Sequence, residues 1–210
     1  MALWLIPFKS AELSQVWISP QEMAWAGALP DRRAEQYRFT RAWMRCCLSR
    51  QLDRSPDQIP LHAPPGQPPS LEQGLGFVSV SHTHDALALA WSLAPIGIDL
   101  ERQDRSFDAL ALARRFFCQR DLELLESMPS EACRGEVLRQ WLAKEAAIKW
   151  QRGSLAHDLL AWSWSGSDEV ANHTRCGWRV CIRHHQWQDW LIAVAGNPAL
   201  SGQDLQIFLR

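Results

Sequence analysis

The amino-acid sequence predicts an α+β protein built from two similar halves, at residues 1–103 and 104–210. Each half holds helix-like segments, in which apolar residues recur about every three or four positions, and about three short strand-like runs. This grouping of helices and strands is typical of an α+β protein. No direct internal repeat is visible, so a duplication is inferred only from the order of the elements.

The composition excludes several classes of protein. The 210 residues are 47% hydrophobic and 21% charged, and a net charge of −1 gives no overall attraction for nucleic acid or an anionic membrane. No apolar run reaches the roughly 18 residues of a membrane span. The apolar N-terminus stops at Pro7 and Lys9 and lacks the basic start of a secretion signal. A cytoplasmic protein that binds neither membranes nor nucleic acid is therefore expected.

Residues 31–54 are predicted to form a helix with one strongly basic face. Trp43, Met44 and Leu48 supply its apolar side. The segment holds three acids and seven arginines, namely Arg32, Arg33, Arg38, Arg41, Arg45, Arg50 and Arg54. Such a run is most often a solvated surface, but in a chain of nearly neutral charge it also indicates a local surface that attracts anions.

A proline-rich loop and three strands are predicted after this helix. Five of the twelve prolines lie between Pro60 and Pro69. Proline cannot continue a helix or a central strand, so this segment is expected to be an extended loop. Strand-like runs follow at residues 76–82, 86–91 and 96–101, and their short connections favour a three-stranded meander.

The second half repeats the combination of helices and strands. Helical periodicity covers residues 107–117, 120–126 and 136–150. Strand-like runs lie near residues 160–164, 178–183 and 190–195.

Two carboxylates occur two residues apart on the strand at 96–101. Strand alternation places Asp99 and Glu101 on the same face, together with Gly97. Adjacent carboxylates repel each other unless they are solvated or a cation lies between them. Mg²⁺ suits such a pair, because it binds carboxylates together with substrate phosphates. Acids at a strand end are usually just surface residues, so this pair alone is a weak indication.

The helix at 136–150 carries a second charged group. At about 100° per residue, Glu145 falls within the apolar arc with Lys149 beside it, while Lys144 lies toward the edge. Glu145 and Lys149 are one turn apart and can form a structural ion pair. A carboxylate aimed at the core needs a strong partner, since burying an unpaired charge is costly. A metal shared with Asp99 and Glu101 would supply one.

These segments resemble the 4′-phosphopantetheinyl transferase superfamily, in its longer, monomeric Sfp-like branch. Gly97-Ile98-Asp99-Leu100-Glu101 matches the family's Gly-(Ile/Val)-Asp-x-Glu, and Trp141 to Lys149 matches its Trp-x-x-Lys-Glu-(Ala/Ser)-x-x-Lys. Ser81-His82 matches a third signature, and the separation of Asp99 from Glu145 is that usual in the family. The resemblance covers roughly residues 30 to 155 and rests on two quite specific motifs.

The resemblance implies both a fold and a reaction. The fold is two α+β halves related by a pseudo-twofold axis, with the active site between them. The reaction moves the phosphopantetheine arm of coenzyme A onto a serine of an apo acyl or peptidyl carrier protein and releases 3′,5′-ADP, with Mg²⁺ as cofactor. The resemblance also implies a monomer.

The catalytic and metal-binding roles follow from the same resemblance. Asp99, Glu101 and Glu145 would hold Mg²⁺ against the pyrophosphate of coenzyme A. Glu145, directly or through a metal-bound water, is the candidate general base. Lys149 would stabilise charge on the leaving phosphate, and His82 would contact the phosphates of coenzyme A.

Further residues are expected to bind coenzyme A. Ser81 would do so beside His82 and Lys149, and Lys144 would lie at the rim near the phosphates. Arg38 and Arg45 are candidates for bidentate contact with the 3′-phosphate, although the sequence does not single them out among the arginines.

Three positions depart from the family pattern. Gln67, in Gly66-Gln67-Pro68, stands where the family usually has lysine, so one phosphate-facing charge is lost and the affinity for coenzyme A is expected to be lower. Thr83-His84 replaces the common Ser-Gly after Ser81-His82, and Leu142 replaces a small hydroxyl residue. None of these changes removes a presumed metal ligand.

Three alternatives fit part of the sequence. A binder of single-stranded nucleic acid would use the arginine helix and exposed tryptophans, but it leaves the acids and Lys149 without a role. A Mg²⁺-dependent phosphodiester hydrolase would use the same acids. An inactive family member is the third, suggested by Gln67.

Overall fold

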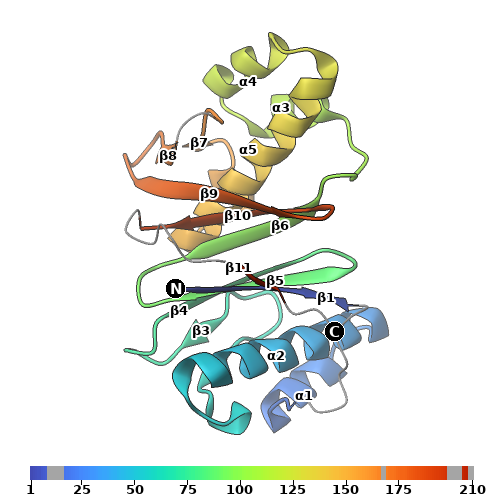
Figure 1. Ribbon diagram of the computed structural model, residues 1–210, viewed down its shortest axis with the longest axis vertical. Coiled ribbons are helices and arrows are strands. Elements are labelled where there is room, and N and C mark those ends of the chain that lie inside the picture. Colours follow the sequence, from blue (N-terminus) through green and yellow to red (C-terminus); the bar gives the residue numbers. More distant parts are fainter. Residues whose placement is uncertain (9–16, 167–168, 198–204, 208–210) are drawn as a thin grey trace.

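The protein folds into four layers, as a computed structural model shows (Figure 1). The structure describes residues 1–8, 17–166, 169–197 and 205–207. Two sheets pack face to face, and one long helix covers the outer face of each sheet. The predicted α+β class is therefore confirmed, whereas the pseudo-twofold relation and the division at residue 103 stay predictions.

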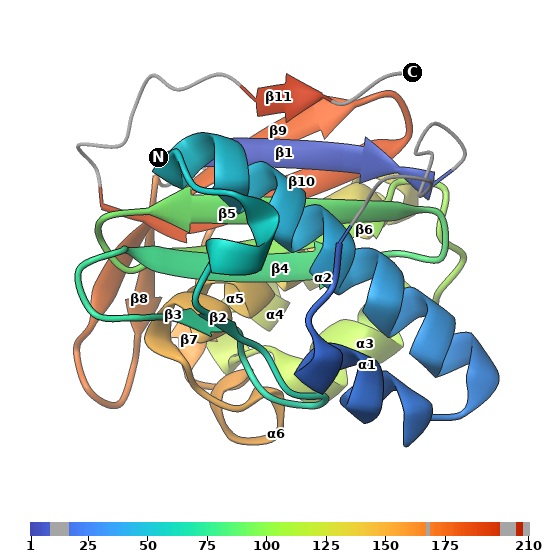
Figure 2. The same ribbon diagram turned by 90° about the horizontal axis from the view of Figure 1, so that it is seen from below.

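The first sheet has the strand order β11-β1-β5-β4, which Figure 2 shows behind helix α2. Its strands are β1 (Ala2–Pro7), β4 (Phe77–His82), β5 (Ala86–Ser92) and β11 (Leu205–Ile207). Strands β1 and β5 are buried on both faces, which explains why their sequences are almost continuously apolar. Helix α2 (Asp31–Leu52) packs on this sheet through Phe39, Met44 and Leu48.

Short elements complete the first half. Helix α1 (Pro20–Gly27) starts with a capping box, in which Ser19 and Glu22 each accept the other's backbone N–H. A 3₁₀ turn (Pro56–Gln58) follows α2. The predicted proline-rich loop is confirmed, apart from the two-residue strands β2 (Leu61–His62) and β3 (Ser70–Leu71), which pair with each other.

The second sheet has the order β6-β10-β9-β8-β7. Its strands are β6 (Gly97–Arg102), β7 (Trp162–Ser163), β8 (Val170–His173), β9 (Arg179–Trp187) and β10 (Trp190–Gly196). The helices of this half are α3 (Ala109–Phe116), α4 (Gln119–Glu126), α5 (Ser130–Gln151) and α6 (Leu155–Asp158). Helix α5 lies on the outer face of the sheet (Figure 1). In the part of the chain that the structure describes, no helix has the length and apolar character needed to cross a membrane.

The expected three-stranded meander is wrong. Strands β4 and β5 form a hairpin, but β6 pairs with β10 of the second sheet, with Asp99 opposite Ala193. Side chains of β4 replace the missing backbone ladder, because the Ile98 N–H donates to Ser79 Oγ at 3.1 Å. The chain thus changes sheets between β5 and β6, and β11 returns to pair with β1.

The two sheets meet in an apolar layer of their own. Alternate residues of β5 are alanines, Ala86, Ala88 and Ala90, and they pack with Ile98 and Ile192 of the second sheet. Small side chains let the sheets approach closely. The strands β4 and β6 lie at the edges of the two sheets, and their polar side chains meet beside this apolar layer.

His184 on β9 is expected to make the stability depend on pH. Burial, and then the charge of Arg139, lower the pKa of its imidazole to about 4. The imidazole of the unfolded chain binds a proton near pH 6.5, whereas that of the folded chain does so only near pH 4. The free energy of unfolding therefore falls by on the order of 3 kcal/mol as the pH falls from 6.5 to 4. The free energies of unfolding in urea at pH 7 and pH 4.5 should differ less in His184→Gln than in the unmodified protein. An equal difference in both proteins would contradict this account.

Candidate active site

A cleft of about 540 Å³ lies between the first sheet with its helix α2 on one side and helix α5 on the other. Helix α2, the proline-rich loop, β4 and α5 all contribute to its lining. Four of the predicted site residues border this interface cleft: Ser81, His82, Glu145 and Lys149. The structure therefore brings the Ser81-His82 motif together with the Trp141–Lys149 motif.

Asp99 links the three elements that meet at the cleft. It lies on β6 and is only 4% exposed. Its Oδ1 accepts hydrogen bonds from Ser81 Oγ of β4 at 2.7 Å and from Lys149 Nζ of α5 at 2.6 Å. A buried carboxylate needs such partners, and here they join the first sheet, the second sheet and the helix behind it.

Glu145 lies beside Asp99 on the cleft side of α5. Burial, and then the charge of Asp99, raise the pKa of its carboxyl to about 8, and Lys149 opposes the rise only in part. The charge of Glu101 also contributes to the rise. The three acids are therefore close enough to repel one another, and Glu145 becomes a carboxyl that can hold a proton near neutral pH.

Glu101 borders a different cavity from Glu145. This second cavity, of about 710 Å³, is also lined by Phe8, His84, Asp85 and Arg105. The Glu101 carboxylate pairs with the Arg105 guanidinium and accepts the Arg102 N–H at 3.1 Å. Within the described residues, no three acid, histidine or cysteine side chains already stand in a metal-binding arrangement. Lys149 and Arg105 instead neutralise Asp99 and Glu101.

His82 is exposed at the cleft. Partial burial, and then the charge of Lys149, lower the pKa of its imidazole below 6.5. It is therefore neutral at pH 7, with one ring nitrogen able to donate and the other to accept a hydrogen bond.

Gly97 allows β6 and α5 to approach closely enough to build this site. A Cβ atom at Gly97 would overlap the carbonyl oxygen of Ala146 and lie 2.5 Å from the Trp150 backbone nitrogen. Both atoms belong to the backbone of α5, so neither can turn aside. The glycine of the acidic motif thus brings Asp99 within reach of Lys149.

Gly97→Ala is expected to impair both folding and activity. The added methyl must push β6 away from α5, which costs about 1–3 kcal/mol by overpacking and separates Asp99 from Lys149. Urea unfolding should detect the loss of stability. Gly135→Ala is the matched control, since Gly135 is an exposed position of α5 with nothing within 4 Å of its Cβ direction, and alanine there should stabilise the helix by about 0.5–1 kcal/mol. Equal stabilities of the two variants would contradict the packing argument.

Comparison with known proteins identifies the family of this site. The model of the 4′-phosphopantetheinyl transferase superfamily matches residues 95–195, the stretch that contains Asp99, Glu101, Glu145 and Lys149. The chain is 35% identical over 162 residues to the 4′-phosphopantetheinyl transferase HetI of Nostoc sp. strain PCC 7120. It is 31% identical over 155 residues to the putative 4′-phosphopantetheinyl transferase slr0495 of Synechocystis sp. strain PCC 6803. The chain belongs to the 4′-phosphopantetheinyl transferase superfamily.

The similarity does not extend over the whole of these relatives. Each match covers 70% of this chain, but the chain covers only 66% of the first relative and 63% of the second. These matches establish the family of the chain but not its activity or its partners, which are argued below from the site.

The expected place of Lys144 in this transferase-family site is wrong. Lys144 is fully buried, away from the interface cleft, whereas its neighbour Glu145 faces the cleft. Its ammonium pairs with Asp121 of α4 at 2.7 Å, donates to the Trp162 carbonyl and lies 4.5 Å from the centre of the Phe117 ring. Helix α5 packs against α4 and β7 on this side. Its buried surface is therefore wider than the helical periodicity of the sequence predicts, and it includes Lys144.

The expected role of Arg45 is also wrong. Arg45 is only 3% exposed, and its guanidinium binds the Glu22 carboxylate at 2.8 Å and the carbonyls of Pro56 and Ile59. These contacts hold α1 and the turn that follows α2 against helix α2, and they leave Arg45 no access to a ligand. Arg38 is half-buried and does not line the cleft. The seven arginines therefore do not form a single basic face.

Other residues line the cleft that sequence reasoning did not select. They are Leu29, Arg33, Gln36, Tyr37, Thr40, Arg41, Pro65, Gln67, Val80 and Leu155. Arg41 is held by the Ala63 carbonyl at 2.8 Å and lies over the Tyr37 ring at 4.3 Å. The helical spacing of Arg33, Tyr37 and Arg41, one turn apart each time, was the signal that could have found this face.

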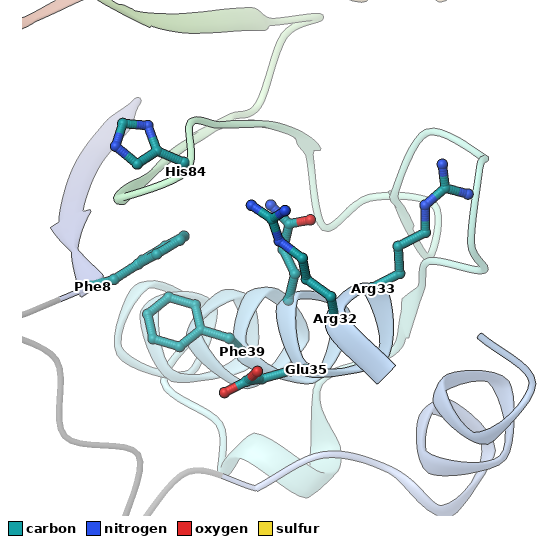
Figure 3. A pocket seen from close by; sticks show the side chains of 7 residues that line it. Phe8, Arg32, Arg33, Glu35, Phe39 and His84 are labelled. Carbon is teal, nitrogen blue, oxygen red and sulfur yellow. The ribbon is translucent and has the colours of Figure 1, made fainter. Parts of the chain in front are cut away.

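A third cavity adjoins the basic start of α2 (Figure 3). It has a volume of about 570 Å³ and shares Arg33 and Gln36 with the interface cleft. Arg32 extends over it, and the rings of Phe8 and Phe39 meet edge to face at 4.5 Å on one side (Figure 3). Arg32 and Arg33, which are exposed at the start of α2, thus lie where this cavity meets the interface cleft.

Proposed function

We propose that this protein transfers the 4′-phosphopantetheine arm of coenzyme A to a serine of an apo carrier protein and releases 3′,5′-ADP. One observation carries the proposal most strongly. Asp99 is buried between Ser81 and Lys149 and beside Glu145, at the inner end of a cleft that arginines line. Acids next to cations at the base of a basic cleft suit a ligand that carries phosphates and a divalent cation.

The donor set fits Mg²⁺. Asp99, Glu101 and Glu145 offer only hard carboxylate oxygens, and burial and then the charge of Asp99 raise the pKa of Glu145, so a cation beside these acids would favour its ionised form. We propose these three residues as the ligands, with Lys149 and Arg105 giving up their present contacts. When bound, Mg²⁺ would neutralise and orient the pyrophosphate.

The cationic residues of the cleft are proposed to bind coenzyme A. Lys149 is close enough to Asp99 to place its charge on the phosphate that leaves with 3′,5′-ADP. Neutral His82, with Ser81 beside it, would hydrogen-bond the phosphates. Arg33 and Arg41 replace Arg38 and Arg45 as the candidates for the 3′-phosphate, because they line the cleft.

The proposed reaction is a single displacement at phosphorus. The carrier serine Oγ forms a bond to the β-phosphorus of coenzyme A, and the bond from that phosphorus to the bridging oxygen of 3′,5′-ADP breaks. The serine proton passes to Glu145, directly or through a water, when its carboxyl is ionised, and the raised pKa makes that carboxylate a stronger base. Burial is the main cause that raises this pKa.

Gln67 is proposed to weaken the binding of coenzyme A. It is exposed and lines the cleft, so a lysine there would face the ligand. An amide can donate hydrogen bonds but supplies no charge.

Mass spectrometry of a carrier protein tests the proposal. The purified protein, coenzyme A, Mg²⁺ and an apo acyl or peptidyl carrier should together yield a carrier whose mass has risen by one phosphopantetheine arm. A carrier with its serine changed to alanine is the control. No mass gain across several carriers of both kinds would refute the proposal. Release of 3′,5′-ADP without any carrier would instead support a Mg²⁺-dependent hydrolase.

We further propose that the protein works as a cytoplasmic monomer. All six cysteines are free thiols, which suits a reducing compartment. A nucleic-acid-binding role has less support, because Arg45, one of the seven arginines, is buried and paired with Glu22.

A further inference from the structure

A charged cluster joins the two sheets at one end of their interface. Asp85 lies in the turn between β4 and β5 of the first sheet, and Arg102 is the last residue of β6 in the second sheet. The Arg102 guanidinium donates to Asp85 Oδ2 at 2.7 Å. Each side chain is only 20% exposed, so the pair is better shielded from water than an ordinary surface ion pair.

Asp85 is held from three directions. Besides Arg102, its carboxylate accepts hydrogen bonds from Thr83 Oγ1 at 2.7 Å and from Trp190 Nε1 of β10 at 3.2 Å. Its two oxygens are therefore engaged by the hairpin turn and by two strands of the other sheet. This geometry leaves the turn little freedom to move relative to the second sheet.

Arg102 is held just as completely. It makes a bidentate contact with Asp104 at 2.7 and 2.6 Å and a longer contact with Asp189 at 3.3 Å. Its guanidinium also lies over the Trp190 ring, 5.6 Å from the centre. The planar fork of arginine suits such a multiple contact, and lysine could not reproduce it.

The cluster adjoins the proposed catalytic residues along both strands. Asp85 follows His82 by three residues, and Arg102 follows Glu101 directly. The same two strands are joined nearer the cleft by the hydrogen bond from Ser81 to Asp99. The cluster and the Ser81–Asp99 contact therefore connect the same strand pair at two points.

We infer that Asp85 and Arg102 are positioning residues, which form a latch that keeps β4, with Ser81 and His82, at a set distance from β6, with Asp99 and Glu101. The inference rests on the proposed transfer reaction for its functional consequence. The latch touches neither coenzyme A nor the carrier serine in this account. It acts through the spacing of the two strands, and a misplacement of about 1 Å can lower a rate about 10²-fold.

The test uses Asp85→Asn, Arg102→Met and the double variant in the full-length protein. Each single variant should lower kcat for carrier modification by about 10- to 100-fold. The KM for coenzyme A should rise less than kcat falls, because Ser81 and His82 would move with β4 whereas Arg33 and Arg41, the candidates for the 3′-phosphate, do not contact the latch. The double variant should lose little more than either single variant, since one broken contact already frees the strands.

Hydrogen–deuterium exchange gives a readout that does not depend on activity. Backbone amides of β4 and β6 should exchange faster in the latch variants. Arg114→Met and Glu126→Gln are the controls, because this exposed pair lies within the second half at 3.0 Å. They should change neither kcat nor the exchange of β4 and β6.

The outcomes separate the latch from the proposed function. If the unmodified protein transfers phosphopantetheine and the latch variants keep its kcat, the inference is overturned. If the unmodified protein shows no transfer, the proposed function fails, and unchanged exchange in β4 and β6 would then overturn the latch as well. Faster exchange together with a lower kcat supports both.

Discussion

Glu145→Gln is expected to abolish phosphopantetheine transfer and, in buffer without divalent cations, to stabilise the folded protein at alkaline pH. The substitution keeps the shape of the side chain and removes its charge and its ability to accept a proton. A general base contributes about 10²- to 10⁴-fold, and a proposed metal ligand is lost with it. Transfer should therefore fall by about 10³-fold or more.

The gain in stability follows from the electrostatics of the site. Burial, and then the charge of Asp99, raise the pKa of Glu145 from an ordinary 4.5 to about 8. Between these pH values the folded protein retains a proton that the unfolded chain has released, so stability falls as the pH rises through this window. Glutamine does not titrate and cannot show this loss. Activity and stability thus depend on the same carboxylate in opposite directions.

Carrier mass spectrometry and thermal unfolding at pH 6 and pH 9 measure the two effects. Glu131→Gln is the matched control, because Glu131 lies on the same helix, in its exposed first turn. It should alter neither activity nor the dependence of stability on pH between 6 and 9. Full activity of Glu145→Gln would show that Glu145 is neither base nor metal ligand. A loss of activity without any gain in thermal stability at pH 9 would contradict the electrostatic argument.

The sequence predicted the α+β class and most of the long elements because their patterns are local. Helix α2 was expected at 31–54 and spans Asp31–Leu52, and α5 was expected at 136–150 and spans Ser130–Gln151. Strand pairing is not local. The run at 96–101 has the same alternation whether it pairs with β5 or with β10, so the meander was wrong. The strand β1 and helix α1 were not predicted.

The candidate site, like the fold, was predicted only in part. The motifs identified the group formed by Ser81, Asp99, Glu145 and Lys149 because each residue type suits the proposed transfer chemistry. The environments of single charged residues could not be predicted, because they depend on elements distant in the chain. Arg45 is paired with Glu22 of α1, and Lys144 with Asp121 of α4. Neither partner lies near it in the sequence, so both cations were mistaken for ligand contacts.

Lys144→Met is expected to destabilise the protein by about 3–5 kcal/mol, because it leaves a buried carboxylate without its partner. Lys144 and Asp121 are 0% and 1% exposed and lie 2.7 Å apart. After the substitution, the described residues leave Asp121 the hydrogen bond from Ser163 Oγ, at 2.6 Å, and the Trp162 carbonyl loses the hydrogen bond from Lys144. Urea unfolding followed by circular dichroism measures the loss.

The exposed pair Arg114–Glu126 is the control for this prediction. Its side chains are 60% and 40% exposed, so Arg114→Met should cost less than about 1 kcal/mol. A similarly small cost for Lys144→Met would mean that water or another group reaches Asp121, and the buried-pair interpretation would then be wrong.

Removing both charges should restore part of the stability. In Lys144→Met/Asp121→Asn the buried carboxylate is gone, while the asparagine can still accept the Ser163 hydrogen bond, so the double variant should be more stable than Lys144→Met by about 1–3 kcal/mol.

The restored variant also separates folding from function. Lys144 and Asp121 tie α5 to α4 on the side away from the interface cleft, whereas Glu145 and Lys149 face it. If the pair only stabilises the fold, the double variant should recover transfer along with stability. If its charges are needed to fix the rotation of α5, stability should return while kcat stays low.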